Sequence, residues 1–341
     1  MNIERKNVFN TESNETIGKR RVFGGNPDGM INFTTMRYEW ALNLWDMMEA
    51  NTWFPKEVNL STDPKDYRML SEPEKRMYDL VLSGLMSMDS MQTNNIMDNI
   101  NPYITAPEIN ACLSRQSYEE ANHSKSYAVM VESISENTDE IYNLWKTDKV
   151  LLEKNRYISL VYKQLSENIT DIDVLLAIVA NQILEGIYFH SGFAAMYALG
   201  KSNKMIGSAQ MIRFIQRDEV THLLLFQNMF NSVRRERPEL FTKELEEKIR
   251  EMFKKAVELE SNWGKHITQS KILGFTDAII EQYIQYLADQ RLVAIGYKPE
   301  YNVSHPIPWV DGYASFNDQR TNFFEGNVTN YSKGSIDFDD F

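Results

Sequence analysis

Apolar residues recur every three or four positions along most of this chain, with polar residues between them. In residues 36–50, for example, Trp40, Leu44 and Met48 fall on one face of a helix. No stretch shows the alternation of apolar and polar residues that predicts a β-strand. The pattern therefore predicts an all-α protein, with main helices at residues 36–50, 71–97, 107–132, 171–199, 208–230, 242–263 and 276–292.

The two ends of the chain differ from this helical part. Residues 1–30 lack the helical period and end in the turn-rich sequence GGNPDGM, while residues 311–341 are rich in Asn, Ser, Gly and Asp. We therefore expect an irregular N-terminal arm (1–30), one helical domain (31–310) and a flexible C-terminal tail (311–341). Because Phe338 and Phe341 stand among acidic residues, the tail suits a peptide that folds onto a groove of a partner.

Composition and charge exclude several classes of protein. A net charge of −12 argues against a nucleic-acid partner. No apolar run approaches the roughly 20 residues of a membrane span, and the N-terminus lacks the apolar core of a signal peptide, so we expect a cytoplasmic protein with no membrane partner. Cys112 is the only cysteine, which leaves any dithiol chemistry to another polypeptide.

Candidate chemistry comes from two Glu-x-x-His pairs, Glu120/His123 and Glu219/His222. Residues at i and i+3 share a helix face, so each pair offers an oxygen and a nitrogen to the same point. A lone acid in an apolar run precedes each pair: Asp89 lies 31 residues before Glu120, and Glu185 lies 34 residues before Glu219. This repeated layout is that of a di-iron or dimanganese carboxylate site in a four-helix bundle.

The alternative interpretation of a Glu-x-x-His pair is an ordinary solvated helix face. Two pairs, each with an acid in an apolar run upstream, favour the metal site, because a buried carboxylate without a partner is costly. The oxygen-rich ligand set suits iron or manganese better than structural zinc. Asp89, Glu120 and His123 would hold one metal, and Glu185, Glu219 and His222 the other, with one carboxylate of each Glu-x-x-His helix as a bridge.

A tyrosine stands beside this predicted site. Tyr127 follows His123 by four residues, one turn along the same face. Phe189 and Phe193 lie on the face of Glu185, and Ile215 precedes Glu219 by one turn. These apolar residues could keep water away from a phenol that the metals oxidise to a radical.

With these residues the chain resembles the small (β) subunit of class I ribonucleotide reductase. The resemblance covers about residue 22 to the end and includes the segments GGNPDGMINF, LMSMDSMQ, YEEANHSKSY, LEGIYFHSGF and IRFIQRDEVTH. It implies a ferritin-like helical bundle with a dinuclear metal site in its core, and it implies an oxidoreductase used in deoxyribonucleotide biosynthesis for DNA replication. By position it implies six metal ligands, a radical residue and three pocket residues: Asp89, Glu120, His123, Glu185, Glu219 and His222; Tyr127; Phe189, Phe193 and Ile215.

The resemblance also implies a route for the radical toward a catalytic large (α) subunit. Trp53 matches a relay tryptophan, and Asp218 matches the acid that bonds it. Tyr331 is the best match for a further relay tyrosine in the tail, ahead of Tyr313, and SIDFDDF would be the docking peptide. A homodimer is implied as well. A di-iron centre is expected, while dimanganese with a flavoprotein activator is the alternative, and the substrate would be a ribonucleoside diphosphate.

Two other functions share the ligand set. A ferritin-like oxidase that acts directly on a bound substrate would need an open apolar pocket at the metals, which Tyr127 and its apolar neighbours would fill. An iron-storage protein is generally much shorter and needs neither Trp53 nor the tail. The radical-generating function is therefore our prediction.

Overall fold

The computed structural model describes residues 3–135, 137–163 and 169–315, and across these residues it contains helices and no β-strand. The α-helices are α1 (Glu39–Ala50), α2 (Asp63–Met69), α3 (Glu72–Asn95), α4 (Pro107–Ile134), α5 (Thr138–Tyr142), α6 (Leu144–Thr147), α7 (Lys149–Lys163), α8 (Asp171–Ile183), α9 (His190–Lys201), α10 (Ile206–Glu236), α11 (Lys243–Thr268), α12 (Asp277–Ala294) and α13 (Trp309–Ala314). The all-α prediction is confirmed.

Local sequence explains where several long helices begin. Ser71 and Glu74 form the predicted capping box of α3, in which each side chain bonds the backbone of the other. Thr170 and Asp173 form a second capping box at α8. Pro107 is the first residue of α4, where its missing N–H costs nothing.

Two π-helices interrupt the regular pattern, and the sequence pattern did not indicate them. One, η3 (Ile96–Ile100), continues α3, and the other, η5 (Leu184–Tyr188), joins α8 to α9. Residues 171–201 therefore form one long apolar helical segment with a wider turn at Glu185. By length and hydropathy this segment could cross a membrane, contrary to our expectation from the sequence, but 83% of its most apolar window is buried inside the protein.

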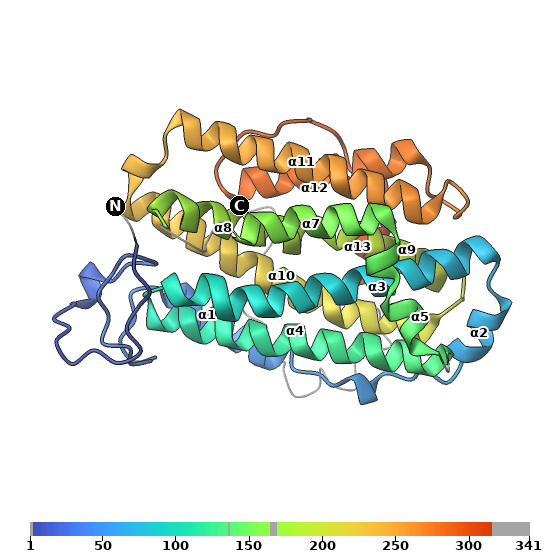
Figure 1. The fold of residues 1–341 in the computed structure, drawn as a ribbon, viewed down its shortest axis with the longest axis horizontal. Coiled ribbons are helices and arrows are strands. Elements are labelled where there is room, and N and C mark those ends of the chain that lie inside the picture. The colour runs from blue at the N-terminus through green and yellow to red at the C-terminus, as the bar shows by residue number, and fades with distance from the viewer. Residues whose placement is uncertain (1–2, 136, 164–168, 316–341) are drawn as a thin grey trace.

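The long helices surround a common centre. Helices α3 and α4 pack on each other, while α10 packs on α8, α9 and α1. Helices α11 and α12 run along one long side of the bundle, and α4 lies on the opposite side (Figure 1). The outer layer formed by α7, α11 and α12 covers the segment that contains η5.

The ends of the described chain are tied to this bundle. The N-terminal arm is irregular apart from the short 3-10 helix η1 (Ile17–Lys19), yet Val22 and Phe23 are fully buried, and the Thr105 N–H donates to the Val22 carbonyl at 2.8 Å. At the other end α13 reaches Ala314, which is past our expected boundary at residue 311. The remaining tail lies outside the described residues.

Candidate metal centre

The six candidate ligands lie together at the centre of the bundle, on four different segments. Asp89 is on α3, Glu120 and His123 are on α4, Glu185 is in η5, and Glu219 and His222 are on α10. Their ligand atoms form two sets, and within each set all atoms lie within 4.8 Å of one another. Glu120 and Glu219 belong to both sets, which are Asp89, Glu120, His123 and Glu219, and Glu120, Glu185, Glu219 and His222.

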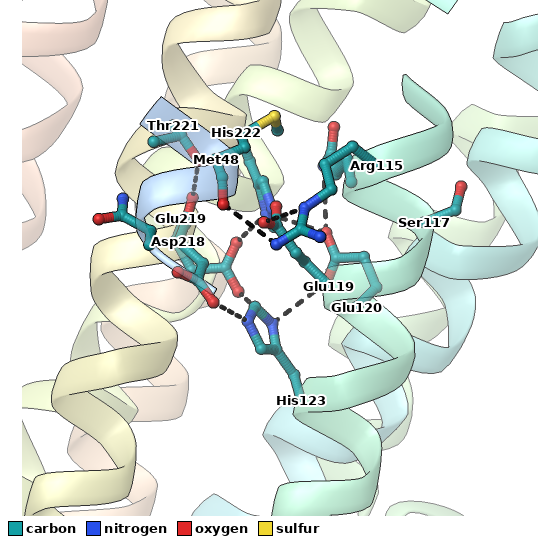
Figure 2. Close-up of polar contacts among 12 residues, drawn as sticks. Met48, Arg115, Ser117, Glu119, Glu120, His123, Asp218, Glu219, Thr221 and His222 are labelled. Carbon is teal, nitrogen blue, oxygen red and sulfur yellow. Dashed lines mark hydrogen bonds and ion pairs between the residues drawn. The ribbon is translucent and has the colours of Figure 1, made fainter. Parts of the chain in front are cut away.

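Both imidazoles point the same ring nitrogen toward the centre. His123 Nδ1 lies 3.2 Å from Glu219 Oε1, and His222 Nδ1 lies 2.8 Å from Glu219 Oε2 and 3.2 Å from Glu120 Oε1. In Figure 2 Glu219 reaches from α10 toward the helix that carries Glu120 and His123. A carboxylate between two inward nitrogens can bridge two metals.

The outer nitrogen of each imidazole meets a second carboxylate. His123 Nε2 lies 3.1 Å from Asp218 Oδ2, and His222 Nε2 lies 2.9 Å from Glu119 Oε2 (Figure 2). Arg115 holds Glu119 in turn, through a 2.9 Å bond from Nε to Oε1. Such outer partners fix the orientation and basicity of metal-binding imidazoles.

Glu119 is the functional residue that the sequence analysis missed. It directly precedes Glu120, as Asp218 directly precedes Glu219, so the repeated pair of adjacent acids was the available signal.

The buried carboxylates of this cluster would be stabilised by bound cations. All six side chains are at most 2% exposed. Within the part of the chain that the structure describes, both Asp89 oxygens, Glu120 Oε2 and Glu185 Oε2 have no hydrogen-bond partner. Burial, and then the charge of Glu120, raise the pKa values of Asp89 and Glu185 well above their ordinary range. Two divalent metal ions would supply the missing charge and satisfy these oxygens, so the residues fit a dinuclear centre.

Tyr127 is completely buried on α4, one turn after His123. Burial, and then the neighbouring Asp89 carboxylate, raise the pKa of its phenol well above the ordinary value, so the phenol is protonated at neutral pH. Phe189, Phe193 and Ile215 are also buried, in the hydrophobic core of the bundle that contains Tyr127. The rings of Phe189 and Phe193 stack at 5.8 Å.

Trp53 is linked to the cluster through Asp218. Its indole Nε1 donates to Asp218 Oδ2 at 2.7 Å, the same oxygen that faces His123 Nε2. The Trp53 ring, which is 3% exposed, stacks on Phe214 at 5.1 Å and faces the His123 ring at 6.5 Å. Trp53, Asp218 and His123 thus form a continuous path from the loop after α1 to the centre.

The structure separates the two candidate tail tyrosines. Tyr313 is in α13, where its ring packs on Tyr197 at 5.0 Å. Tyr331 lies outside the described residues. Tyr313 is therefore part of the folded domain.

Together, the fold and the cluster define a ferritin-like helical protein with a dinuclear metal centre. Residues 30–306 match the family model described as "Ribonucleotide reductase, small chain". The chain belongs to this family, and the resemblance seen in the sequence is confirmed.

Similar proteins agree with this assignment. The chain is 39% identical to the ribonucleoside-diphosphate reductase subunit beta of Treponema pallidum, over 99% of this chain and 98% of the relative. It is 35% identical to the subunit of that name from Halalkalibacterium halodurans, over 98% of this chain and 97% of that relative. Among solved structures, the ribonucleotide reductase R2 subunit from Clostridium botulinum aligns with a TM-score of 0.89 and 37% identity, over 92% of this chain and 100% of that one.

A more distant structure shares the fold. The dimanganese(II) protein from Streptococcus sanguinis aligns with a TM-score of 0.75 and 23% identity, over 84% of this chain and 99% of that one. Family membership makes this protein the radical-generating small subunit of a ribonucleotide reductase, an oxidoreductase that acts with a large subunit and forms a dimer.

Proposed function

We propose that Asp89, Glu120, His123, Glu185, Glu219 and His222 bind two metal ions, with Glu120 and Glu219 as the bridges. The observation that carries this proposal is that both four-residue ligand sets contain these two carboxylates. Asp89 and Glu185, whose buried oxygens lack hydrogen-bond partners, each occur in one set only, so each would help to hold one of the two ions. We propose two iron ions, with dimanganese and a flavoprotein activator as the alternative, because the donor set suits both metals.

The proposed radical residue is Tyr127. When bound, the metal pair supplies the oxidising equivalent for a nearby phenol. Because the phenol is protonated, Tyr127 must lose its proton together with its electron. Its complete burial in the hydrophobic core, which also contains Phe189, Phe193 and Ile215, would exclude water and reductants from the radical.

The path out of the centre uses Trp53 and Asp218. The 2.7 Å bond between the Trp53 indole and Asp218, and the 3.1 Å contact of Asp218 with His123, support a proton-coupled transfer along these three residues. Tyr331 would continue the path in the tail, and a thiol of the large subunit would receive the radical. This division of roles is consistent with the single, buried cysteine of this chain.

We propose that the chain consists of an arm (1–30), a helical domain (31–310) and a tail (311–341), and that the tail has a role in assembly with the large subunit. The tail would bind the large subunit through its acidic, Phe-containing end, and the dimer would be a homodimer. The relatives' name suggests ribonucleoside diphosphates as substrates of the complete enzyme. We place the protein in the cytoplasm, without nucleic-acid or membrane partners.

Activity with the large subunit tests these proposals. A chain truncated before Asn327 should neither bind the large subunit nor reduce ribonucleoside diphosphates, whereas its metal content should equal that of the full chain. As the matched variant, Tyr331→Phe should keep the binding and lose the activity. An active truncated chain would refute docking through the tail, and an active Tyr331→Phe would remove that residue from the path.

A further inference from the structure

Glu185 stands apart from the other candidate ligands because it lies in a π-helix. The wider turn of η5 (Leu184–Tyr188) changes back to α-helix at His190. Such a change disturbs the regular pairing of backbone N–H and C=O groups, and buried backbone groups need partners. The segment around Glu185 therefore depends on bonds from elsewhere in the protein.

Three charged side chains from the outer helices supply such bonds. Lys154 Nζ on α7 donates to the Tyr188 carbonyl at 2.7 Å. Glu260 Oε1 on α11 accepts the Ser191 N–H at 3.1 Å. Arg291 Nε on α12 donates to the Gly186 carbonyl at 3.3 Å. Helices α7, α11 and α12 carry no candidate ligand, and each of them thus holds one backbone group within six residues of Glu185.

Lys154 and Glu260 are an unusual pair, because both charges are completely buried. Lys154 is 1% exposed and Glu260 is 0% exposed, and Lys154 Nζ donates to Glu260 Oε2. Lys154 Nζ also lies 5.2 Å from the Tyr188 ring centroid and 5.5 Å from that of Trp263. Removing two charges from water is expensive, so a buried ion pair often adds little net stability over an apolar pair. Because Lys154 and Glu260 bond the backbone of η5 and α9, we infer that this pair fixes the conformation of that backbone.

Arg291 reaches η5 because Gly186 has no side chain. A Cβ atom on Gly186 would lie 2.9 Å from Arg291 Nε and 3.1 Å from its Cδ. The guanidinium-bearing chain therefore lies directly across the residue that follows Glu185.

We propose that Lys154, Glu260 and Arg291 form a backbone clamp that keeps residues 184–191 in the π-helical conformation and thereby positions Glu185 for its metal. If the wide turn relaxed to an α-helix, the register would change by one residue, and the helix on one side of the turn would rotate by about 100° relative to the helix on the other side, which would misalign Glu185 with the other ligands. Among the described residues, the three clamp side chains form no hydrogen bond or ion pair with a candidate ligand, so they are positioning residues. This inference rests on the proposed assignment of Glu185 as a ligand.

Anaerobic titration of metal-free protein with Mn(II) tests the clamp, with free Mn(II) measured by its EPR signal. The wild-type chain should bind two Mn(II) ions. The double variant Lys154→Met/Glu260→Gln removes both charges without leaving one unpaired, and it should bind one of the two ions at least about 10-fold more weakly. Arg291→Met removes the bond to the Gly186 carbonyl and should weaken the binding of the same ion. It tests the clamp independently if the double variant does not fold. Arg291→Lys should bind this ion more tightly than Arg291→Met, because Lys can still donate to the carbonyl.

The matched control is Arg237→Met. It breaks the partly buried Arg237–Asp171 pair, which joins α10 to the start of α8 about 14 residues from Glu185. The clamp would be overturned if the folded clamp variants bound both Mn(II) ions as tightly as the wild type. It would also be overturned if Arg237→Met lost as much Mn(II) affinity as the clamp variants. A wild-type chain that does not bind two ions would instead overturn the ligand assignment itself.

Discussion

At the scale of single residues, the centre depends on carboxylates that hold the two imidazoles from outside. Asp218 and Glu119 each face an outer imidazole nitrogen at about hydrogen-bond distance, 3.1 and 2.9 Å. An imidazole whose outer N–H is fixed keeps its inner nitrogen free for a metal. The two sides differ, because Asp218 also bonds Trp53, while Glu119 is held by Arg115.

Replacing Glu119 should therefore weaken the metal site without affecting Trp53. In Glu119→Ala, His222 loses the partner that fixes its ring, and we expect one Mn(II) ion to bind about 10-fold more weakly in an anaerobic titration. The tryptophan fluorescence of the chain, to which Trp53 contributes, should not change. Ser114→Ala, on the exposed side of the same helix, is the control and should leave both ions unchanged. Unaltered binding in Glu119→Ala would mean that Glu119 only pairs with Arg115 and does not position His222.

The candidate ligands could be recognised in the sequence because their chemistry is local. A Glu-x-x-His pair needs only helical geometry, and a lone acid in an apolar run is conspicuous. The bond between Trp53 and Asp218 could not be predicted in this way, because 165 residues separate the two partners. The residues alone suggested only a core position for Trp53, and its predicted role came from the family resemblance.

At the scale of elements, the long helices and the capping box at Ser71 were predicted from apolar period and N-cap chemistry. The π-helix at Glu185 was not, because the sequence LEGIY suits an α-helix equally well. The bonds to Gly186, Tyr188 and Ser191 come from three other helices. Non-local contacts of this kind cannot be read from a helical pattern.

The contact between α2 and α3 should make stability depend on pH. Asp79 on α3 accepts a 2.9 Å bond from Tyr67 on α2, and burial raises its pKa to about 6 from 3.8. The folded protein thus prefers the protonated carboxyl, and this contribution to stability is lost as pH rises from about 4 to about 6. Asp79→Asn should therefore be more stable than the wild type at pH 7, by about 3 kcal/mol.

Thermal unfolding of both chains between pH 4 and pH 7 measures this effect. The difference in Tm should be largest at pH 7 and vanish near pH 4. The comparison cancels the other titrating groups, since both chains share them. A variant that is less stable than the wild type at pH 7 would show that the ionised Asp79 carboxylate stabilises the contact.

At the scale of the whole molecule, the bundle buries four carboxylates at one point. Without cations this arrangement opposes folding, because the charges repel and are removed from water. Metal binding should therefore raise the stability of the entire domain. With free Mn(II) at 1,000 times its dissociation constant, one site contributes about 4 kcal/mol.

The Tm of metal-free protein, with and without Mn(II), measures this linkage. We expect a clear increase for the wild type and little or none for Glu219→Ala, which removes the carboxylate that is common to both ligand sets. An equal increase in both chains would place the stabilising Mn(II) ions elsewhere on the acidic surface.

The central claim is that this bundle exists to make a radical on Tyr127. The most direct test is the EPR spectrum of metal-free protein loaded anaerobically with Fe(II) and then exposed to O2, recorded for the wild type, Tyr127→Phe and Tyr78→Phe. Tyr78 is the control, since it is equally buried but bonds Ser208 at the start of α10. We predict a tyrosyl signal in the wild type and Tyr78→Phe, no such signal in Tyr127→Phe, and about two irons per chain in all three. A tyrosyl signal that persists in Tyr127→Phe would contradict the account.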